Sequence, residues 1–311
     1  MSEPITILLP VYNDTASLQM LLKDVQQLDA AILSRISMVV VNDGSASFKL
    51  DAVGNTPLTI VHLSRNLGHQ KAIAIGLSYI KENMPGATVI VMDGDGEDRV
   101  ADIPQLLQAN AREPNTVFFA ARQRRTNGLF FKLFYWLYKF SFWLSTGKKI
   151  SFGNYSVLSY NTLCRAVYYS EIWNNYPGGI MKSGLPYKAL PTQRGSRYAG
   201  KSKMNFTALL LHGFGAISVF LEVIITRIAI ISFLMILVSA LSIAAILIIR
   251  TTTSLAIPGW ASIVGTSMVI ILLISFIISL IAIFIYLSTQ SQRKFIPALH
   301  YRDYILQTET R

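Results

Sequence analysis

The chain has 311 residues, a formal net charge of +11 and 52% hydrophobic residues, a composition too apolar for an ordinary soluble domain. The charge is divided unevenly, because residues 1–98 carry a net charge of −5 whereas residues 99–227 carry +13. We expect no nucleic-acid partner, since the basic region runs directly into long apolar segments, a pattern that favours phosphates and an anionic membrane surface.

The first 120 residues alternate short apolar runs with amphipathic segments. Runs rich in β-branched residues, which predict strands, lie at residues 5–11, 38–41, 58–63, 88–92 and 117–121. Helical periodicity occurs at residues 17–28, 69–81 and 103–111. This alternation predicts an α/β fold with a Rossmann-like, mostly parallel sheet covered by helices on both faces. Ligands of such sheets bind at the carboxyl ends of the strands.

Polar motifs follow the first two runs. The first run ends in PVYND at residues 10–14 and lacks the glycine-rich dinucleotide fingerprint, which argues against hydride transfer. The second run ends in NDGS at residues 42–45. Its Asp43 can accept hydrogen bonds from a nucleotide base or ribose, or it can cap a turn.

The fourth run leads into DGDGED, residues 93–98. Asp93, Asp95 and Glu97 would project to one side of an extended loop, and Gly94 would allow a ligand to approach the backbone closely. Clustered carboxylates repel one another unless a positive charge lies between them, so the loop predicts a Mg²⁺ or Mn²⁺ site shared with a diphosphate. A calcium loop or an acidic helix N-terminus is the alternative, although the loop is too short for an EF-hand and lacks its terminal glutamate.

Two uncharged segments, residues 228–249 and 261–287, predict transmembrane helices. At 1.5 Å per residue the first would span about 33 Å, enough to cross the hydrocarbon core of a bilayer. The loop between them has no Lys or Arg beyond Arg250, whereas the flanking segments are basic. The positive-inside rule therefore predicts that the catalytic domain and both termini are cytoplasmic, at an inner or plasma membrane.

The remaining segments complete the expected organisation. Residues 1–205 would form the cytoplasmic catalytic domain. An aromatic-rich stretch near residues 129–144 predicts a helix in the headgroup plane, although a buried core helix would have a similar composition. Residues 206–227 predict a juxtamembrane helix, and residues 288–311 a cytoplasmic C-terminal tail. The single cysteine, Cys164, excludes an intrachain disulfide and fits a reducing compartment.

Five motifs in order along the chain resemble those of a known family. PVYN at residues 10–13, NDGS at 42–45, RNLG at 65–68 and DGD at 93–95 resemble the motifs of inverting family-2 glycosyltransferases with a GT-A fold. RYAGKSK at residues 197–203, just before the two apolar segments, resembles the polyprenyl- and dolichyl-phosphate glycosyltransferase branch. The resemblance covers nearly the whole chain.

The resemblance implies a role for each matching residue. Those implied to bind the nucleotide are Pro10, Tyr12, Asn13, Asp43, Asp93 and Gly94. Those implied to bind the metal and diphosphate are Asp93, Asp95 and Glu97. Those implied to contact phosphate groups are Arg122, Arg197 and Lys203. Without the resemblance, the last two would be interpreted as a solvated basic loop.

The chain departs from the family pattern at two positions. Glu97 stands where many relatives have Gln, so this site is more acidic. Asn154 occupies a catalytic position at which many relatives have an acid, and an amide cannot act as a general base. The reaction can proceed without one, because a phosphate monoester with a second pKa of about 6 is already mostly dianionic at neutral pH.

The sequence therefore predicts a metal-dependent hexosyltransferase. It would move a sugar, with inversion, from a UDP- or GDP-sugar to polyprenyl phosphate at the cytoplasmic face of the membrane, and we expect a homo-oligomer. Two alternatives stay open: a membrane glycosyltransferase that acts on a carbohydrate or another lipid, and a non-enzymatic membrane scaffold.

Overall fold

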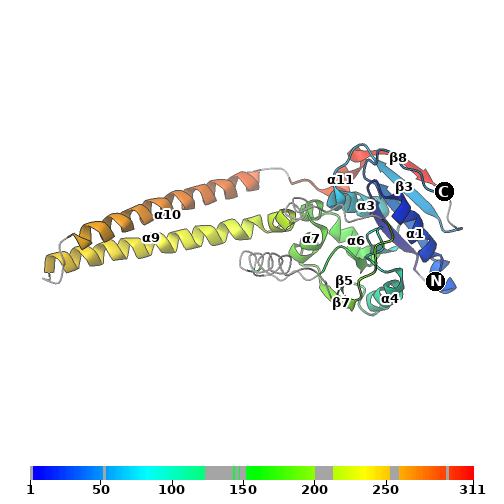
Figure 1. Cartoon of the computed structure of the whole chain (residues 1–311), viewed down its shortest axis with the longest axis horizontal. Helices are drawn as coiled ribbons and strands as arrows, with labels where there is room; N and C mark the ends of the chain where they lie inside the picture. The colour runs from blue at the N-terminus through cyan, green and yellow to red at the C-terminus, as the bar shows by residue number, and fades with distance from the viewer. Residues whose placement is uncertain are drawn as a thin grey trace. The chain divides into compact units, whose positions relative to one another are not determined.

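The computed structural model describes residues 3–51, 54–122, 143, 147, 152–199, 213–252, 259–291 and 294–311. The chain forms two compact units (Figure 1). The first comprises Met1–Lys139, Lys149–Val219 and Lys294–Arg311, and the second comprises Phe140–Lys148 and Phe220–Arg293. The predicted interfacial helix near residues 129–144 lies, apart from Trp143, outside the described residues.

A mixed eight-stranded sheet with the order β7-β5-β6-β4-β1-β2-β3-β8 forms the centre of the first unit. Its strands are β1 (Ile5–Val11), β2 (Ile36–Asn42), β3 (Leu58–Leu63), β4 (Thr88–Val91), β5 (Val117–Arg122), β6 (Ser156–Leu158), β7 (Tyr187–Thr192) and β8 (Ile305–Thr310). Strands β4, β1, β2 and β3 are parallel, as are β5 and β7, whereas β6 and β8 are antiparallel to their neighbours. The predicted mostly parallel, Rossmann-like sheet is confirmed.

The sheet separates two apolar cores. On β1, Leu8 belongs to one core, whereas Ile7 and Leu9 belong to the other, because successive side chains point to opposite faces. The first core is lined by α3 (His69–Asn83), α6 (Tyr160–Ala166) and α7 (Tyr176–Lys182), and the second by α1 (Thr15–Val25) and α4 (Ile103–Arg112). Short connecting helices are α2 (Ala30–Leu33) and the 3₁₀ helices η1 (Val100–Asp102) and η2 (Ser170–Trp173). Since both faces are covered, β1 and β4 are buried at every position.

The C-terminal segment completes this sheet. Helix α10 (Trp260–Ser291) is followed by α11 (Pro297–His300), the 3₁₀ helix η3 (Tyr301–Tyr304) and β8. Strand β8 pairs with β3, with Thr310 opposite Thr59 and Ile305 opposite Leu63. The C-terminal tail predicted over residues 288–311 thus contains a strand of this sheet, and residues 305–310 cover an edge of β3 that would otherwise leave backbone groups unpaired.

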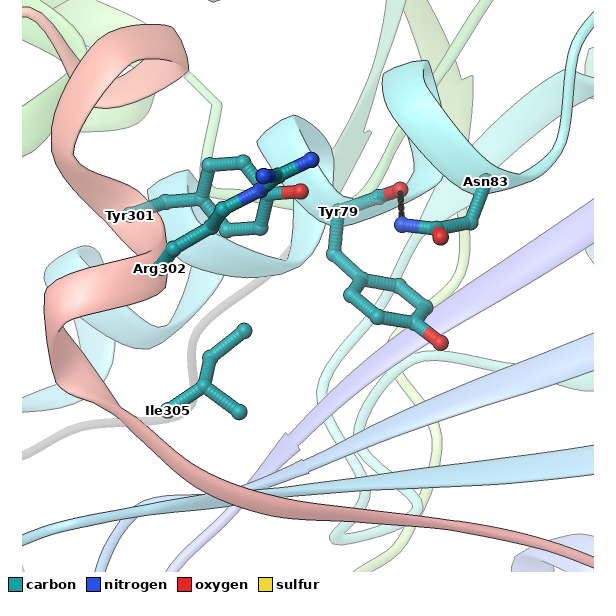
Figure 2. Close-up of a pocket in the computed structure, with 5 residues that line it drawn as sticks. All are labelled: Tyr79, Asn83, Tyr301, Arg302 and Ile305. Carbon is teal, nitrogen blue, oxygen red and sulfur yellow. Dashed lines mark hydrogen bonds between the residues drawn. The ribbon is translucent and has the colours of Figure 1, made fainter.

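Contacts with α3 hold the C-terminal segment in place. The Tyr301 hydroxyl donates to Glu82 Oε2, and Arg302 forms an ion pair with Glu82 Oε1. Figure 2 shows the shallow pocket of about 320 Å³ at this junction, lined by Tyr79, Asn83, Tyr301, Arg302 and Ile305. None of these residues is among those predicted to bind substrate.

Two apolar helices, α9 (Leu221–Thr252) and α10, dominate the second unit, and each has 32 residues. Both are long and apolar enough to cross a membrane. Their large apolar side chains are mostly exposed, with Phe233 at 63% and Phe284 at 73%, unlike those of core helices in soluble proteins. Both predicted segments lie within these helices, which extend further at each end. The last part of the predicted juxtamembrane helix, residues 221–227, is the beginning of α9.

Helices α9 and α10 pack against each other through regularly spaced positions. The buried residues of α9 recur at every seventh position and are Ile225, Ser232, Ser239 and Ile246. Helix α10 buries Ser275 and Ala282, also seven residues apart. Small side chains let helix backbones approach closely, and a seven-residue repeat is typical of left-handed helix packing. The two helices therefore form a close-packed hairpin.

Glu82→Ala removes the partner of both Tyr301 and Arg302. We expect the free energy of unfolding of the first unit to fall by about 1 kcal/mol, because these contacts are partly exposed to solvent. Amide hydrogen exchange in β8 should become faster. Glu113→Ala, which breaks a similarly exposed ion pair with Lys188 on β7, is the control and should leave β8 exchange unchanged. Equal β8 exchange in both variants would show that sheet pairing alone holds the strand.

Candidate active site

The polar motifs found in the sequence meet at one edge of the sheet. Strands β4, β1, β2 and β3 are adjacent and parallel, so their carboxyl ends lie together, where α/β proteins bind ligands. Residues 10–14, 42–45, 65–68 and 93–98 lie at these strand ends and in the loops that follow them. The four motifs therefore lie at the edge where ligands of such sheets are expected to bind.

Asp43 holds the loop that follows β3. Its carboxylate accepts the backbone N–H groups of Leu67 at 2.7 Å and Gly68 at 2.9 Å, and the residue is only 3% exposed. Burial raises the pKa of the Asp43 carboxyl, and the two hydrogen bonds offset this only in part. Both carboxylate oxygens of Asp43 thus hold the turn at Leu67 and Gly68. Capping of a turn was the alternative role that the sequence left open for Asp43. Its direct contact with a nucleotide stays a prediction.

Asn13 and Gly44 join neighbouring loops. Asn13 has a left-handed φ of 50°; its N–H donates to Ser45 Oγ at 2.8 Å, and its side-chain oxygen accepts from Ala46 N–H at 3.1 Å. Gly44, with a φ of 69°, lies so close to the following loop that a Cβ would come within 2.5 Å of the Arg65 carbonyl carbon. The NDGS motif therefore holds neighbouring loops together, in addition to placing polar groups at the strand end.

The other residues predicted to bind the nucleotide differ in accessibility. Tyr12 is 45% exposed, so its ring is accessible to a base or ribose. Pro10 is buried within β1 and has no backbone N–H to donate, so it shapes the strand end. A Cβ on Gly94 would lie 3.5 Å from Val11 Cγ2, so the backbone there leaves space for close approach of a ligand. Their contacts with a nucleotide stay predictions.

The acidic loop, residues 93–98, is held in shape by its own carboxylates. Asp98 Oδ2 accepts the N–H of Asp93 at 2.8 Å, and Asp95 Oδ1 accepts the N–H of Glu97 at 3.0 Å. Asp98 is only 1% exposed and supports the loop from beneath. This role of Asp98 was not predicted, because nothing in the sequence distinguishes Asp98 from the other acids of the cluster.

The loop concentrates negative charge. Burial raises the pKa of the Asp95 carboxyl, and the nearby charges of Asp93 and Glu97 raise it further, although the Glu97 N–H and Arg197 act in the opposite direction. Loss of hydration and repulsion between like charges both disfavour the ionised carboxylate. A cation bound here would relieve both effects.

A basic segment, residues 193–198, crosses the acidic loop and is called the crossing segment here. Its backbone pairs with the loop, since Gly195 N–H donates to Glu97 O at 2.9 Å and Tyr198 N–H donates to Asp95 O at 3.0 Å. The loop is therefore covered by a second stretch of backbone.

Two arginines of the crossing segment pair with the carboxylates beneath. Arg197 forms an ion pair with Asp95 Oδ2, and its Nε lies 3.9 Å from Glu97 Oε1. Arg194 lies 2.6 Å from Glu97 Oε1. The structure thus brings Arg197 to the acids predicted to bind the diphosphate, while its contact with phosphate stays a prediction.

Two other predicted phosphate ligands are only partly located. The backbone of Arg122 ends β5 opposite Thr192 of β7, directly before the crossing segment, but its side chain lies outside the described part. Lys203 also lies outside the described residues. Their contacts with phosphate stay predictions.

A chain of side-chain contacts runs from Asp93 to α7. His69 Nε2 lies 3.0 Å from Asp93 Oδ1 and 3.0 Å from Asn154 Nδ2. Gln70 Nε2 donates to Asn154 Oδ1 at 3.0 Å, and Gln70 Oε1 accepts the Tyr176 N–H at 2.6 Å. Because a backbone N–H can only donate, Tyr176 fixes the orientation of the Gln70 amide and, through it, that of Asn154.

His69 and Gln70 were not predicted as site residues. Their one sequence cue is the position of two polar side chains at the start of α3, directly after the RNLG motif. Burial lowers the pKa of the His69 imidazole, but the adjacent Asp93 carboxylate raises it, and the net pKa lies above the ordinary histidine value. Asp93 thus favours a positive charge next to the acidic loop.

The acids fit a cation that is shared with a substrate. In the described residues, no group of three or more His, Cys, Asp or Glu side chains is arranged to hold a metal ion. Arg194 pairs with Glu97, and metal binding by Asp93, Asp95 and Glu97 stays a prediction. Asp93 and Asp95 remain close enough to affect each other's charge. Mg²⁺ sites that use one or two carboxylates with substrate phosphates match this arrangement better than an all-protein cage.

Asp98→Ala should leave the Asp93 N–H buried without its acceptor. We expect the free energy of unfolding to fall by about 2 kcal/mol and Mn²⁺ binding to weaken, because the acidic loop would lose its support. Asp98→Asn keeps an oxygen acceptor and should recover most of both quantities, as measured by thermal unfolding and metal titration. Equal losses in the two variants would show that the charge of Asp98, rather than its hydrogen bond, is needed.

Comparison with known proteins agrees with this geometry. Residues 6–174 match the family model described as glycosyl transferase family 2. The uncharacterized glycosyltransferase YkcC of Bacillus subtilis is 25% identical over 287 residues, covering 89% of this chain and 85% of the relative. An undecaprenyl-phosphate 4-deoxy-4-formamido-L-arabinose transferase of Sodalis glossinidius is 31% identical over 140 residues, covering 42% of this chain and 40% of that enzyme. The similarity thus spans less than half the length of the latter relative.

Solved structures show the same fold. Glucosyl-3-phosphoglycerate synthase from Mycobacterium tuberculosis, in complex with Mn²⁺, uridine diphosphate and phosphoglyceric acid, matches with a TM-score of 0.50 and 14% identity over 72% of this chain and 79% of that chain. Because the family model covers more than half of the sequence, the chain belongs to glycosyl transferase family 2.

Proposed function

We propose that this enzyme transfers a sugar from a UDP- or GDP-sugar to polyprenyl phosphate at the cytoplasmic surface of the membrane, with inversion at the anomeric carbon. The observation that carries the proposal is the contact of Arg197 with Asp95 at the strand edge of a family-2 chain that also has two candidate membrane spans. The anionic groups of the donor and the acceptor would both bind where the acidic loop contacts the basic crossing segment.

The acidic loop would bind the diphosphate of the donor. Asp93 and Asp95 would hold Mg²⁺ or Mn²⁺ together with diphosphate oxygens, and Tyr12 and Asn13 would contact the base and ribose. The cation would neutralise charge that develops on the leaving nucleoside diphosphate. Asp43 would act indirectly, by holding the loop beside the nucleotide.

The acceptor would need no proton removed by the protein. A dianionic phosphate oxygen can attack the anomeric carbon from the side opposite the diphosphate, so that one C–O bond forms as the other breaks and the configuration inverts. Asn154 cannot accept a proton at neutral pH, and its amide is held by Gln70, whose Nε2 donates to Asn154 Oδ1. The role of these residues would be to orient the reactants.

Basic side chains would bind the acceptor phosphate. Arg197 can present two parallel N–H groups to phosphate oxygens, and Arg122 and Lys203 would add positive charge nearby. A polyprenyl phosphate keeps its tail in the bilayer and exposes its phosphate at the surface, which suits a site connected by short segments to α9 and α10.

The chain path supports a common side for both termini. The N-terminal strand β1 and the C-terminal strand β8 belong to one sheet, and α9 and α10 lie between them in sequence. If both helices cross the bilayer, the chain returns to the side from which it left. The basic segments that flank the spans favour the cytoplasmic side of an inner or plasma membrane. We further propose a homo-oligomer.

The metal requirement can be tested directly. The purified full chain is incubated with a panel of UDP- and GDP-sugars and polyprenyl phosphate, and the lipid product is identified by mass. We expect EDTA to abolish transfer and Asp95→Asn to lower kcat by at least about a hundredfold, since charge on the leaving diphosphate would be poorly neutralised. Asp303→Asn alters an exposed acid in η3 and should be neutral. Full turnover in EDTA would refute metal dependence, and a preferred soluble sugar acceptor would refute the lipid assignment.

Asn154→Ala tests whether the protein supplies a base. The variant should lose much less activity than Asp95→Asn, because only orientation is affected. The acid limb of the pH–rate profile should follow the acceptor phosphate, with a pKa of about 6. A limb that disappears when one carboxylate outside the acidic loop is replaced would identify a protein base and contradict this mechanism.

A further inference from the structure

The crossing segment is anchored at its C-terminal end to α1. The Tyr198 hydroxyl donates to Asp24 Oδ2, and the Tyr198 ring packs against the core that α1 lines. Burial raises the pKa of the Tyr198 hydroxyl, and the neighbouring Asp24 carboxylate raises it further, so the hydroxyl keeps its proton and remains a donor. The residue next to Arg197 is thus fixed to a helix of the catalytic unit.

The fit between the crossing segment and the acidic loop is tight. A Cβ on Gly195 would lie 2.2 Å from Gly96 O, and a Cβ on Gly96 would lie 2.5 Å from the Tyr198 ring. Gly96 also has a left-handed φ of 90°. Only glycines at these two positions allow the segments to approach closely enough for Arg197 to reach Asp95.

Both oxygens of Asp95 are engaged in this arrangement. Oδ1 accepts the Glu97 N–H, and Oδ2 pairs with Arg197. A divalent cation on Asp95 would take the place of the guanidinium, because two positive groups at one oxygen repel each other. A diphosphate arriving with the cation would offer the released guanidinium new acceptors for bidentate hydrogen bonds.

We propose that Tyr198 and Asp24 are positioning residues that hold Arg197 on Asp95 until a divalent cation and diphosphate displace it. Donor binding then makes the Arg197 guanidinium available to phosphate. This inference rests on the proposed function, since it assigns the cation and diphosphate to the same site.

The test uses Mn²⁺ alone as the probe, titrated into the full chain in detergent and followed by the paramagnetic signal of free Mn²⁺. Arg197→Gln should bind Mn²⁺ about tenfold more tightly than the wild type, because the competing cation is removed. Tyr198→Phe changes no charge and should bind about threefold more tightly. Arg194→Gln removes a positive charge that pairs with Glu97 rather than with Asp95. It therefore measures the effect of losing one nearby positive charge, and its increase in Mn²⁺ affinity should be smaller than that of Arg197→Gln.

Hydrogen exchange supplies a second readout in the wild type. The Gly195 and Tyr198 amides, which donate to the acidic loop, should exchange faster after addition of Mn²⁺ and inorganic pyrophosphate. Slower exchange, or Mn²⁺ binding by Arg197→Gln and Tyr198→Phe that is no tighter than in the wild type, would overturn the inference. In that case sugar transfer by the wild type with Mn²⁺ would leave the proposed function intact. A wild type that neither binds Mn²⁺ nor forms product would overturn both.

Discussion

Repulsion among the carboxylates of residues 93–98 is the constraint on which the active edge of this protein depends. Each acid in the loop has a different partner. Asp98 accepts a backbone N–H of its own loop, Asp93 faces His69, Asp95 pairs with Arg197 and Glu97 pairs with Arg194. Since the partners of Asp93, Asp95 and Glu97 come from α3 and from the crossing segment, their negative charges are countered only when distant parts of the chain are folded around the loop. The site is therefore a product of the whole first unit rather than of one motif.

The fold was predictable where strands are buried on both faces. Strands β1 and β4 are buried at every position and mostly apolar, so runs rich in β-branched residues identified them. Strand β8, in contrast, has the sequence ILQTET and is largely exposed, with Leu306 at 70%. An edge strand needs few apolar residues, because its stability comes from backbone pairing with β3. Its sequence therefore does not differ from that of a polar tail.

The residue types of the site and their positions at the strand ends could be predicted from the sequence, but their hydrogen-bond partners could not. Asp43 and Asn13 stand at the strand ends where ligand-binding residues were expected, yet much of their hydrogen bonding is with neighbouring loops. A sequence shows that a carboxylate is present, but the N–H groups it faces depend on the register of adjacent strands. Gln70 was missed for the same reason, since its partners Asn154 and Tyr176 lie 84 and 106 residues away along the chain.

The order of segments along the chain joins the sheet to the two apolar helices. Strand β3 is made early in the sequence, but its partner β8 follows α10, so the sheet edge stays open until both helices have been synthesised. An open edge of a parallel sheet exposes unpaired backbone groups and favours association with other chains. The contacts of Glu82 with Tyr301 and Arg302 then fasten the returning segment to α3. Completion of the catalytic sheet is thus coupled to completion of the helical hairpin, because the C-terminal segment that follows α10 contains β8, the strand that pairs with β3.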